Sequence, residues 1–269
     1  MKFVLFRHGH SLANQESRIV SSLENGTRTT GGPEGIGFGL SSKGKLEVEE
    51  SAQSLSEHIV ASLLPGRRVQ IRILTSPFQR TRDTALIINR ILRESLNRIH
   101  HERGPEAEST IQMEGNEPEE VQDLRERFFG EFEMKSPSDE LYAQVWHEDA
   151  YNAFHQKFGV ESVAAVTERM TGVVREQEAK EKNQRVDASR ATSQDATTTP
   201  ATATMTAETT QSETWVIMVS HGDSLQILQT AMRGWSGDRH RQIEHLNTAE
   251  WRIVEWCKEL AGAHQSGHS

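Results

Sequence analysis

Three short apolar runs stand out along the chain, at residues 3–6, 69–75 and 215–220. Runs of this length that are rich in aromatic and β-branched residues are typical of buried strands. The first and third runs each end in a His-Gly pair, and the second ends in Ser-Pro. We therefore predict three buried strands, each followed by a turn and the start of a helix.

Apolar residues spaced three or four positions apart predict helices between these strands. The pattern indicates helices over residues 40–64, 77–97, 136–158, from about 160 to 177, and 223–233, with further short strands at 111–114 and 250–255. Strands that alternate with helices favour an α/β fold with a mostly parallel sheet between two layers of helices. A single domain over residues 1–269, a three-layer sandwich, is the organisation that we expect.

Two segments interrupt this pattern. Residues 15–39 are polar and rich in glycine, which predicts a long loop insertion. It leaves directly from the turn after the first strand, so it forms either a rim of a site there or an ordinary surface insertion. Residues 183–213 are rich in threonine and poor in apolar side chains. Such a segment buries too little surface to offset its ordering entropy, so we expect it to be disordered.

Composition limits the classes of partner and compartment. The net charge of −9 argues against nucleic-acid binding, which relies on basic surface. The single cysteine cannot form an intrachain disulfide, as is usual in a reducing compartment. The apolar start is too short for a signal peptide, and no stretch approaches the ~20 apolar residues that cross a bilayer. These features predict a cytoplasmic protein without a membrane partner, and they leave the oligomeric state open.

Histidine and arginine side chains follow the predicted strands at the edge where parallel sheets bind ligands. Arg7 and His8 end the first strand, and His221 ends the third. The free N–H groups of helices that start at this edge also favour anions. We therefore expect a phosphate group to bind in such a cationic crevice.

Arg80 reaches the same edge through a helix start. Ser76 is suited to the N-cap, Pro77 to the first helical position, and Gln79 to a capping box. Arg80 would then lie in the first turn of the helix.

Four motifs in this order resemble the histidine phosphatase superfamily, which is also known as phosphoglycerate mutase-like. They are RHGHSLAN at 7–14, SPFQRTRDTA at 76–85, LRERFFGEFE at 124–133 and SHGDS at 220–224. The resemblance implies the α/β sandwich described above and a phosphatase that works through a phosphohistidine.

The resemblance also assigns roles to residues. It implies that His8 is the nucleophile, that Glu126 is the acid and later the base, with Glu133 as the next candidate, and that no cofactor or metal takes part. The groups expected to hold a small phosphorylated substrate are Arg7, Arg80 and His221 in the catalytic centre, and Gly9, Ser11, Asn14 and Gly222 around it.

Departures from the family pattern favour hydrolysis. Phe129 stands where the mutases usually have tyrosine, and residues 130–168 lack the arginine pair that holds the carboxylate of phosphoglycerate. His10 stands where Glu or Gln is frequent. We therefore expect a phosphomonoester phosphatase. A mutase-type phosphotransferase and a catalytically silent phosphate-binding protein are the alternatives, and the substrate ranges from small phosphate esters to phosphoproteins.

Overall fold

A computed structural model describes residues 1–27, 37–62, 68–103, 111–194 and 212–256. Its central sheet has six strands within these ranges, in the order β3-β2-β5-β1-β6, with β4 also paired to β2. The bounds are β1 Lys2–Arg7, β2 Arg68–Thr75, β3 Ile111–Met113, β4 Glu119–Glu120, β5 Ser212–Ser220 and β6 Trp251–Val254. All pairs are parallel except β1 with β6, so the predicted mostly parallel sheet is confirmed.

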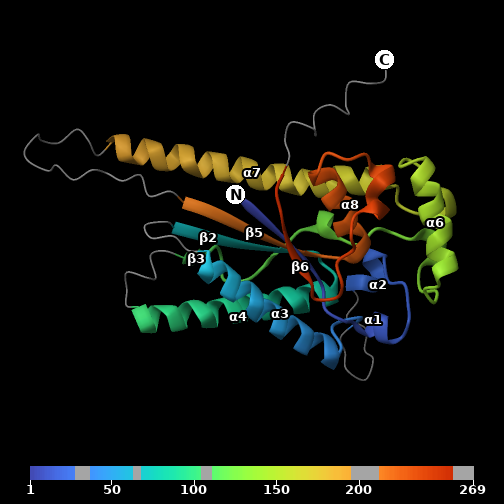
Figure 1. Cartoon of the computed structure of the whole chain (residues 1–269), viewed down its shortest axis with the longest axis horizontal. Helices are drawn as coiled ribbons and strands as arrows, with labels where there is room; N and C mark the ends of the chain where they lie inside the picture. Colours follow the sequence, from blue (N-terminus) through green and yellow to red (C-terminus); the bar gives the residue numbers. More distant parts are fainter. Residues whose placement is uncertain (28–36, 63–67, 104–110, 195–211, 257–269) are drawn as a thin grey trace, which may run out of the picture.

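Helices cover both faces of the sheet, as Figure 1 shows. They are α1 Leu12–Gln15, α2 Leu23–Thr27, α3 Ser42–Ala61, α4 Gln79–Arg103, α6 Asp139–Tyr151, α7 Val163–Gln194 and α8 Gly222–Met232. The pairs α3 with α4 and α7 with α8 lie on opposite sides of the strands, whereas α1, α2 and α6 lie beyond one end of the sheet.

Alternation of side chains along β1 divides the core into two apolar layers. Val4 and Phe6 pack with buried residues of α3 and α4, whereas Phe3 and Leu5 pack with those of α7 and α8. Both layers run across β5 as well, because its side chains from Trp215 to Val219 are fully buried. The three-layer sandwich predicted from the sequence is thereby confirmed.

Two predicted helix ends are wrong. α4 continues through Arg103, beyond the end predicted at residue 97. The helix predicted over 136–158 ends at Tyr151, because Asn152 is extended and its side chain accepts a hydrogen bond from the Phe154 amide. A short polar side chain that bonds the following backbone in this way competes with helix continuation.

The two predicted insertions contain helical parts. α2 lies within 15–39 and α1 ends at its first residue, Gln15, while residues 28–36 are outside the described residues. α7 continues to Gln194, so the disorder predicted from residue 183 does not hold for its first part, and residues 195–211 are outside the described residues. Polar contacts support this helix: Gln184 accepts from Arg72 of β2, and Glu181 accepts from Thr214 of β5.

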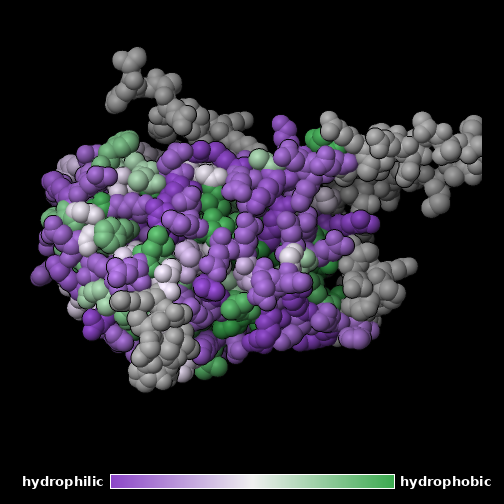
Figure 2. Space-filling view, turned by 180° about the vertical axis from the view of Figure 1, so that it is seen from behind, coloured by the Kyte–Doolittle hydropathy of each residue, from purple (hydrophilic) through white to green (hydrophobic). Residues whose placement is uncertain are grey.

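The surface is mostly polar. Figure 2 shows one face that is largely hydrophilic, with small hydrophobic areas scattered over it. In the part of the chain that the structure describes, no helix combines the length and the apolar character needed to cross a membrane.

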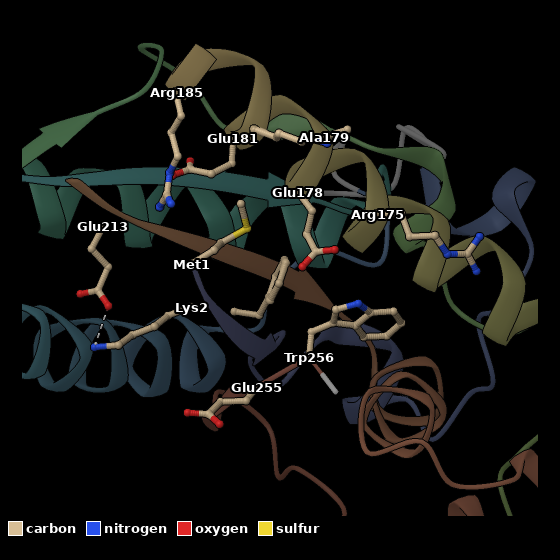
Figure 3. A pocket seen from close by; sticks show the side chains of 12 residues that line it. Met1, Lys2, Arg175, Glu178, Ala179, Glu181, Arg185, Glu213, Glu255 and Trp256 are labelled. Atoms are coloured by element: carbon tan, nitrogen blue, oxygen red, sulfur yellow. Dashed lines mark hydrogen bonds and ion pairs between the residues drawn. The ribbon is translucent and has the colours of Figure 1, made fainter. Parts of the chain in front are cut away.

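A cavity of about 810 Å³ lies between α7 and the amino ends of β1 and β5 (Figure 3). Its charged lining is largely paired within the protein: Lys2 contacts Glu213 at 3.3 Å, and Arg185 contacts Glu181 at 3.1 Å. His8 and His221 follow the carboxyl ends of the same two strands, so this cavity is at the opposite end of the sheet from them.

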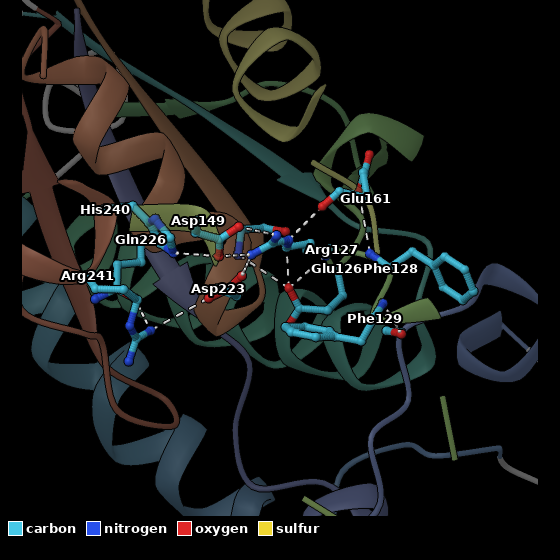
Figure 4. A network of polar contacts seen from close by, with 12 residues as sticks. Glu126, Arg127, Phe128, Phe129, Asp149, Glu161, Asp223, Gln226, His240 and Arg241 are labelled. Atoms are coloured by element: carbon cyan, nitrogen blue, oxygen red, sulfur yellow. Dashed lines mark hydrogen bonds and ion pairs between the residues drawn. The ribbon is translucent and has the colours of Figure 1, made fainter. Parts of the chain in front are cut away.

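A buried ion-pair network fastens the segment between β4 and α7 to α8 (Figure 4). Arg127 is fully buried and donates two hydrogen bonds of 2.8 Å to Asp149 of α6 and one of 3.2 Å to Asp223 of α8. His155 also contacts Asp149, at 2.6 Å. Buried charges with these partners hold α6 in one position relative to the first turn of α8.

We expect Leu5→Ala to lower the free energy of unfolding by about 2–5 kcal/mol, because it opens a cavity in a filled core. Leu5 is 0% exposed, whereas Leu46 on α3 is 62% exposed. Urea unfolding followed by circular dichroism tests this, with Leu46→Ala as the matched control, whose cost we expect to stay within about 0.5 kcal/mol. Equal losses for the two variants would contradict the assigned core.

We expect Arg127→Met to destabilise the fold by about 3–5 kcal/mol, because it leaves Asp149 and Asp223 buried without their guanidinium partner. Arg90 pairs with Glu49 and Glu94 on the surface, so Arg90→Met should cost at most about 1 kcal/mol. The same unfolding measurement compares the two variants, and a small loss for Arg127→Met would mean that the network does not support the fold.

Candidate active site

His8 is fixed where β1 ends. Its backbone N–H donates to Ser220 O at 3.1 Å, and its carbonyl accepts from the Ala249 N–H at 3.1 Å. The first residue beyond β1 is thus held both by the end of β5 and by the turn that precedes β6. The side chain is buried, with 4% of its surface exposed.

The hydrogen bonds of the His8 ring define its tautomer. Nδ1 lies 2.8 Å from Gly9 O, and a carbonyl oxygen only accepts, so Nδ1 carries the proton. Nε2 is then the basic nitrogen, and it accepts from Arg80 Nε at 3.0 Å. The lone pair of Nε2 therefore faces the guanidinium group of Arg80.

Arg80 connects the two histidines. It lies in the first turn of α4, where its Nη2 donates to His221 Nδ1 at 2.9 Å and to Val20 O at 2.9 Å. The rings of His8 and His221 are 5.2 Å apart between centroids. The predicted approach of these three side chains, far apart in the sequence, is what the structure shows.

The helix start before Arg80 differs from the prediction. The Ser76 hydroxyl lies 2.9 Å from His221 Nε2, and the Gln79 side chain donates to Asp83, so the predicted capping box is absent. Because His221 Nδ1 accepts from Arg80, its Nε2 carries the proton that is donated to Ser76. Ser76 thus orients the second histidine.

Both imidazoles are neutral at ordinary pH. Burial lowers the pKa of His8 well below its usual value, and the positive charges of Arg80 and Arg7 add to the effect. Burial and Arg80 likewise lower the pKa of His221. Burial also lowers the pKa of Arg80, to about 10, which leaves its guanidinium group charged.

Arg7 approaches from the opposite side, against the start of α8. Its Nη1 donates to Leu246 O at 2.7 Å and lies 3.3 Å from His245 Nδ1. A Cβ on Gly222 would lie 3.2 Å from Arg7 Cζ and 2.7 Å from His245 Nε2, so glycine makes room for both side chains. His245 was not predicted as a site residue, because it lies neither at the end of a predicted strand nor at the start of a predicted helix.

Two buried donors of this cluster have no partner among the described residues. They are Arg7 Nε and Arg80 Nη1. Buried N–H groups of arginine are rarely left unsatisfied, since the desolvation of a charged donor is costly. A pair of them in one cationic cluster therefore marks a place for an anion.

Glu126 lies at the N-terminus of α8. Its Oε1 accepts from the Ser224 N–H at 3.3 Å, the Ser224 hydroxyl at 3.1 Å and the Arg127 N–H at 2.9 Å (Figure 4). Burial raises the pKa of Glu126, and the nearby carboxylate of Asp223 raises it further, against the charge of Arg80. Glu126 therefore keeps a proton to a higher pH than an exposed glutamate.

Glu133, the next candidate for the acid, has a different environment. Its carboxylate accepts from both the backbone and the hydroxyl groups of Ser21 and Ser22, and from Asn25. Burial acts to raise the pKa of Glu133, but these hydrogen bonds outweigh it and lower that pKa. An ionised carboxylate that anchors the 21–25 segment is a structural group, so Glu126 is the better candidate.

The remaining predicted contacts serve local structure. Ser11 is buried and caps α1, and its hydroxyl donates to Asn14 Oδ1, while its N–H does the same. Asn14 itself is exposed. A Cβ on Gly9 would lie 2.6 Å from Gly44 O, so this glycine permits the close packing of the His8 turn on α3.

The chemistry that this cluster can perform follows from its charges. Two guanidinium groups that each have an unpaired N–H donor suit the oxygens of a tetrahedral anion. The neutral imidazole can act as a nucleophile, and the protonated carboxyl group can act as an acid. Among the described residues, no three His, Cys, Asp or Glu side chains gather in a way that would hold a metal ion.

One protein-family model matches part of the chain. Residues 106–188 match the family described as histidine phosphatase superfamily (branch 1). No curated protein sequence matches the chain.

Similar solved structures cover nearly the whole chain at low identity. A mycobacterial glucosyl-3-phosphoglycerate phosphatase in complex with VO3 is 17% identical, with a TM-score of 0.58 over 95% of this chain and 96% of its own. A protein named mycobacterial hydrolase 2 is 17% identical, with a TM-score of 0.55 over 99% and 98%. A putative α-ribazole-5'-P phosphatase from Escherichia coli is 14% identical, with a TM-score of 0.51 over 96% and 92%.

The fold over almost the whole chain and the family match over residues 106–188 confirm the resemblance predicted from the four motifs, which is to the phosphoglycerate mutase-like histidine phosphatase superfamily.

Proposed function

We propose that this protein is a phosphomonoester phosphatase that works through a phosphohistidine on His8. The observation that carries the proposal is the neutral His8 imidazole beside Arg80, in a buried cluster whose Arg7 Nε and Arg80 Nη1 groups have no partner among the described residues. Two solved structures of this fold are named as phosphatases, which supports the same reaction class by analogy.

The first step transfers the phosphoryl group to His8. Substrate oxygens accept hydrogen bonds from Arg7 and Arg80, which frees His8 Nε2 from its hydrogen bond with the Arg80 Nε–H. The Nε2 lone pair then forms a bond to phosphorus while the bond from phosphorus to the ester oxygen breaks. The proton stays on Nδ1, which donates it in a hydrogen bond to Gly9 O, so the ring becomes positively charged as its phosphoryl group adds negative charge.

Glu126 donates a proton in the first step and accepts one in the second. Its carboxyl group gives its proton to the leaving alkoxide, which departs as an alcohol. The resulting carboxylate then accepts a proton from the water that attacks phosphorus, and the P–N bond breaks to release phosphate and the neutral imidazole. The raised pKa of Glu126 suits this exchange, because the acid form persists nearer to neutral pH.

The contacts around the site favour water over a sugar acid as the acceptor. Residues 130–168 contain no arginine, and Arg127 is fully occupied by Asp149, Asp223 and the Glu161 carbonyl. Arg125 and Arg169 pair with Glu161, and Arg241 lies over the Trp146 ring and donates to Gln226. No free guanidinium pair is thus available among the described residues here for a substrate carboxylate.

We expect wild-type protein to hydrolyse p-nitrophenyl phosphate and His8→Ala to lose at least about 10³-fold in kcat/KM, because the nucleophile is removed. The exposed His147 provides the control, and His147→Ala should keep wild-type activity. Release of p-nitrophenolate measures both.

Undiminished activity of His8→Ala would remove His8 from the reaction. An assay with 3-phosphoglycerate and a bisphosphoglycerate primer separates the alternative reaction: release of free phosphate supports hydrolysis, and formation of 2-phosphoglycerate supports a mutase.

We expect Glu126→Gln to lower kcat/KM for alkyl phosphates by about 10²–10⁴-fold and for p-nitrophenyl phosphate much less, because a good leaving group needs no acid. With wild type, kcat/KM for alkyl phosphates should fall as pH rises through the raised pKa of Glu126, and this alkaline limb should vanish in the variant. The acid limb should lie below the usual histidine range, since the pKa of His8 is lowered.

The exposed Glu131, from the same segment, supplies the control Glu131→Gln, which should behave like wild type. Equal slowing of both substrate types by Glu126→Gln would exclude Glu126 as the acid.

A further inference from the structure

Tyr142 of α6 stands beside the segment that carries Glu126. Its ring packs edge-on against Phe129, with centroids 5.3 Å apart and an angle of 84° between the ring planes. Its other neighbour is Trp146, one helical turn along, whose ring is stacked at 5.0 Å and 9°. Rings held on two sides keep the phenol in a defined orientation.

The Tyr142 hydroxyl has no hydrogen-bond partner among the described residues, and it is not one of their buried unsatisfied atoms either. It lies close enough to Glu126, Arg7 and Arg80 for their charges to act on it. Burial, together with the negative charge of Glu126, raises the pKa of the Tyr142 phenol, so it remains an O–H donor at neutral and mildly alkaline pH. An ordered donor without a partner next to a reaction centre is available to a bound molecule.

The other hydrogen-bond donors near Tyr142 are either neutral or already in contact with another side chain. Trp146 Nε1 is a buried N–H group without a partner among the described residues. The Arg241 guanidinium lies 3.6 Å from the centroid of the Trp146 ring and 3.6 Å from Asp223. Neutral donors beside the acid suit hydroxyl and ether oxygens, whereas a carboxylate would need an unpaired cation.

We infer that Tyr142 is a specificity-determining residue that donates a hydrogen bond to a hydroxyl oxygen of the leaving group, so that the preferred substrates are phosphate esters of polyhydroxylated, sugar-like alcohols. This inference rests on the proposed phosphatase activity. The phosphoryl group lies among Arg7, His8 and Arg80, and the ester oxygen faces Glu126. In this pose, the second carbon from that oxygen, which bears the nearest hydroxyl of a polyol ester, is directed toward the Tyr142 side of the acid.

Two esters with the same three-carbon chain test this contact. sn-Glycerol 3-phosphate carries hydroxyls on the second and third carbons counted from the ester oxygen, and n-propyl phosphate lacks them. We expect Tyr142→Phe to lower kcat/KM for sn-glycerol 3-phosphate by about 5- to 10-fold, as for the loss of one hydrogen bond, and to leave n-propyl phosphate unchanged. Phenylalanine keeps both ring contacts, and an unchanged inhibition constant for vanadate, which has no leaving group, checks that the phosphate pocket is intact.

The chain offers a matched control, because Tyr151 is its only other tyrosine and is 78% exposed on the same helix. Tyr151→Phe should match wild type with both esters. Equal losses on both esters in Tyr142→Phe, weaker vanadate inhibition, or no loss at all would overturn the inference while the phosphatase proposal stands. A wild-type protein that hydrolyses p-nitrophenyl phosphate but neither ester would also overturn the inference alone. A wild-type protein that hydrolyses none of the three compounds would overturn the proposed function, and this inference with it.

Discussion

The desolvation of positive charge at the carboxyl edge of the sheet is the constraint on which the site depends. Arg7 and Arg80 are brought together without a carboxylate of the described residues in direct contact, and the neutral histidines between them take up only part of their hydrogen-bonding capacity. The folded state carries this cost because two layers of apolar side chains hold the strands in register. Binding of an anion would relieve this cost, which is the property that the proposed phosphatase activity requires of the site.

The buried network around Arg127 fixes the elements around Glu126, on the side of the site where the leaving group is proposed to lie. One guanidinium group joins the loop that carries Glu126, the helix that carries Tyr142 and the helix whose first turn receives the Glu126 carboxyl. A carboxyl group at a helix N-terminus is normally stabilised as an anion. Here burial and Asp223 oppose that effect and leave Glu126 able to hold a proton. Acid chemistry at this position thus depends on the balance between a helix end and a neighbouring carboxylate.

The residues that end regular strands could be predicted from the sequence, and those placed by irregular backbone could not. Arg7, His8 and His221 follow β1 and β5, and Arg80 opens α4, so strand and helix patterns were enough to bring them together. His245 and Tyr142 escaped prediction. His245 lies in an irregular segment before β6, and Tyr142 is indistinguishable by spacing from any tyrosine on a partly exposed helix. The end of α6 and the extension of α7 depend on single polar contacts, at Asn152 and Glu181, that apolar periodicity does not register.

The place of β1 in the sheet has a consequence for how the protein folds. This strand lies between β5 and β6, and the backbone of His8 is bonded to Ser220 on one side and Ala249 on the other. The turn that carries His8 is therefore completed by segments more than two hundred positions farther along the chain. Contacts of this sequence separation form slowly, because a long stretch of chain must close before they are made. We therefore expect the geometry around His8 to be established late in folding, after the local helices have formed.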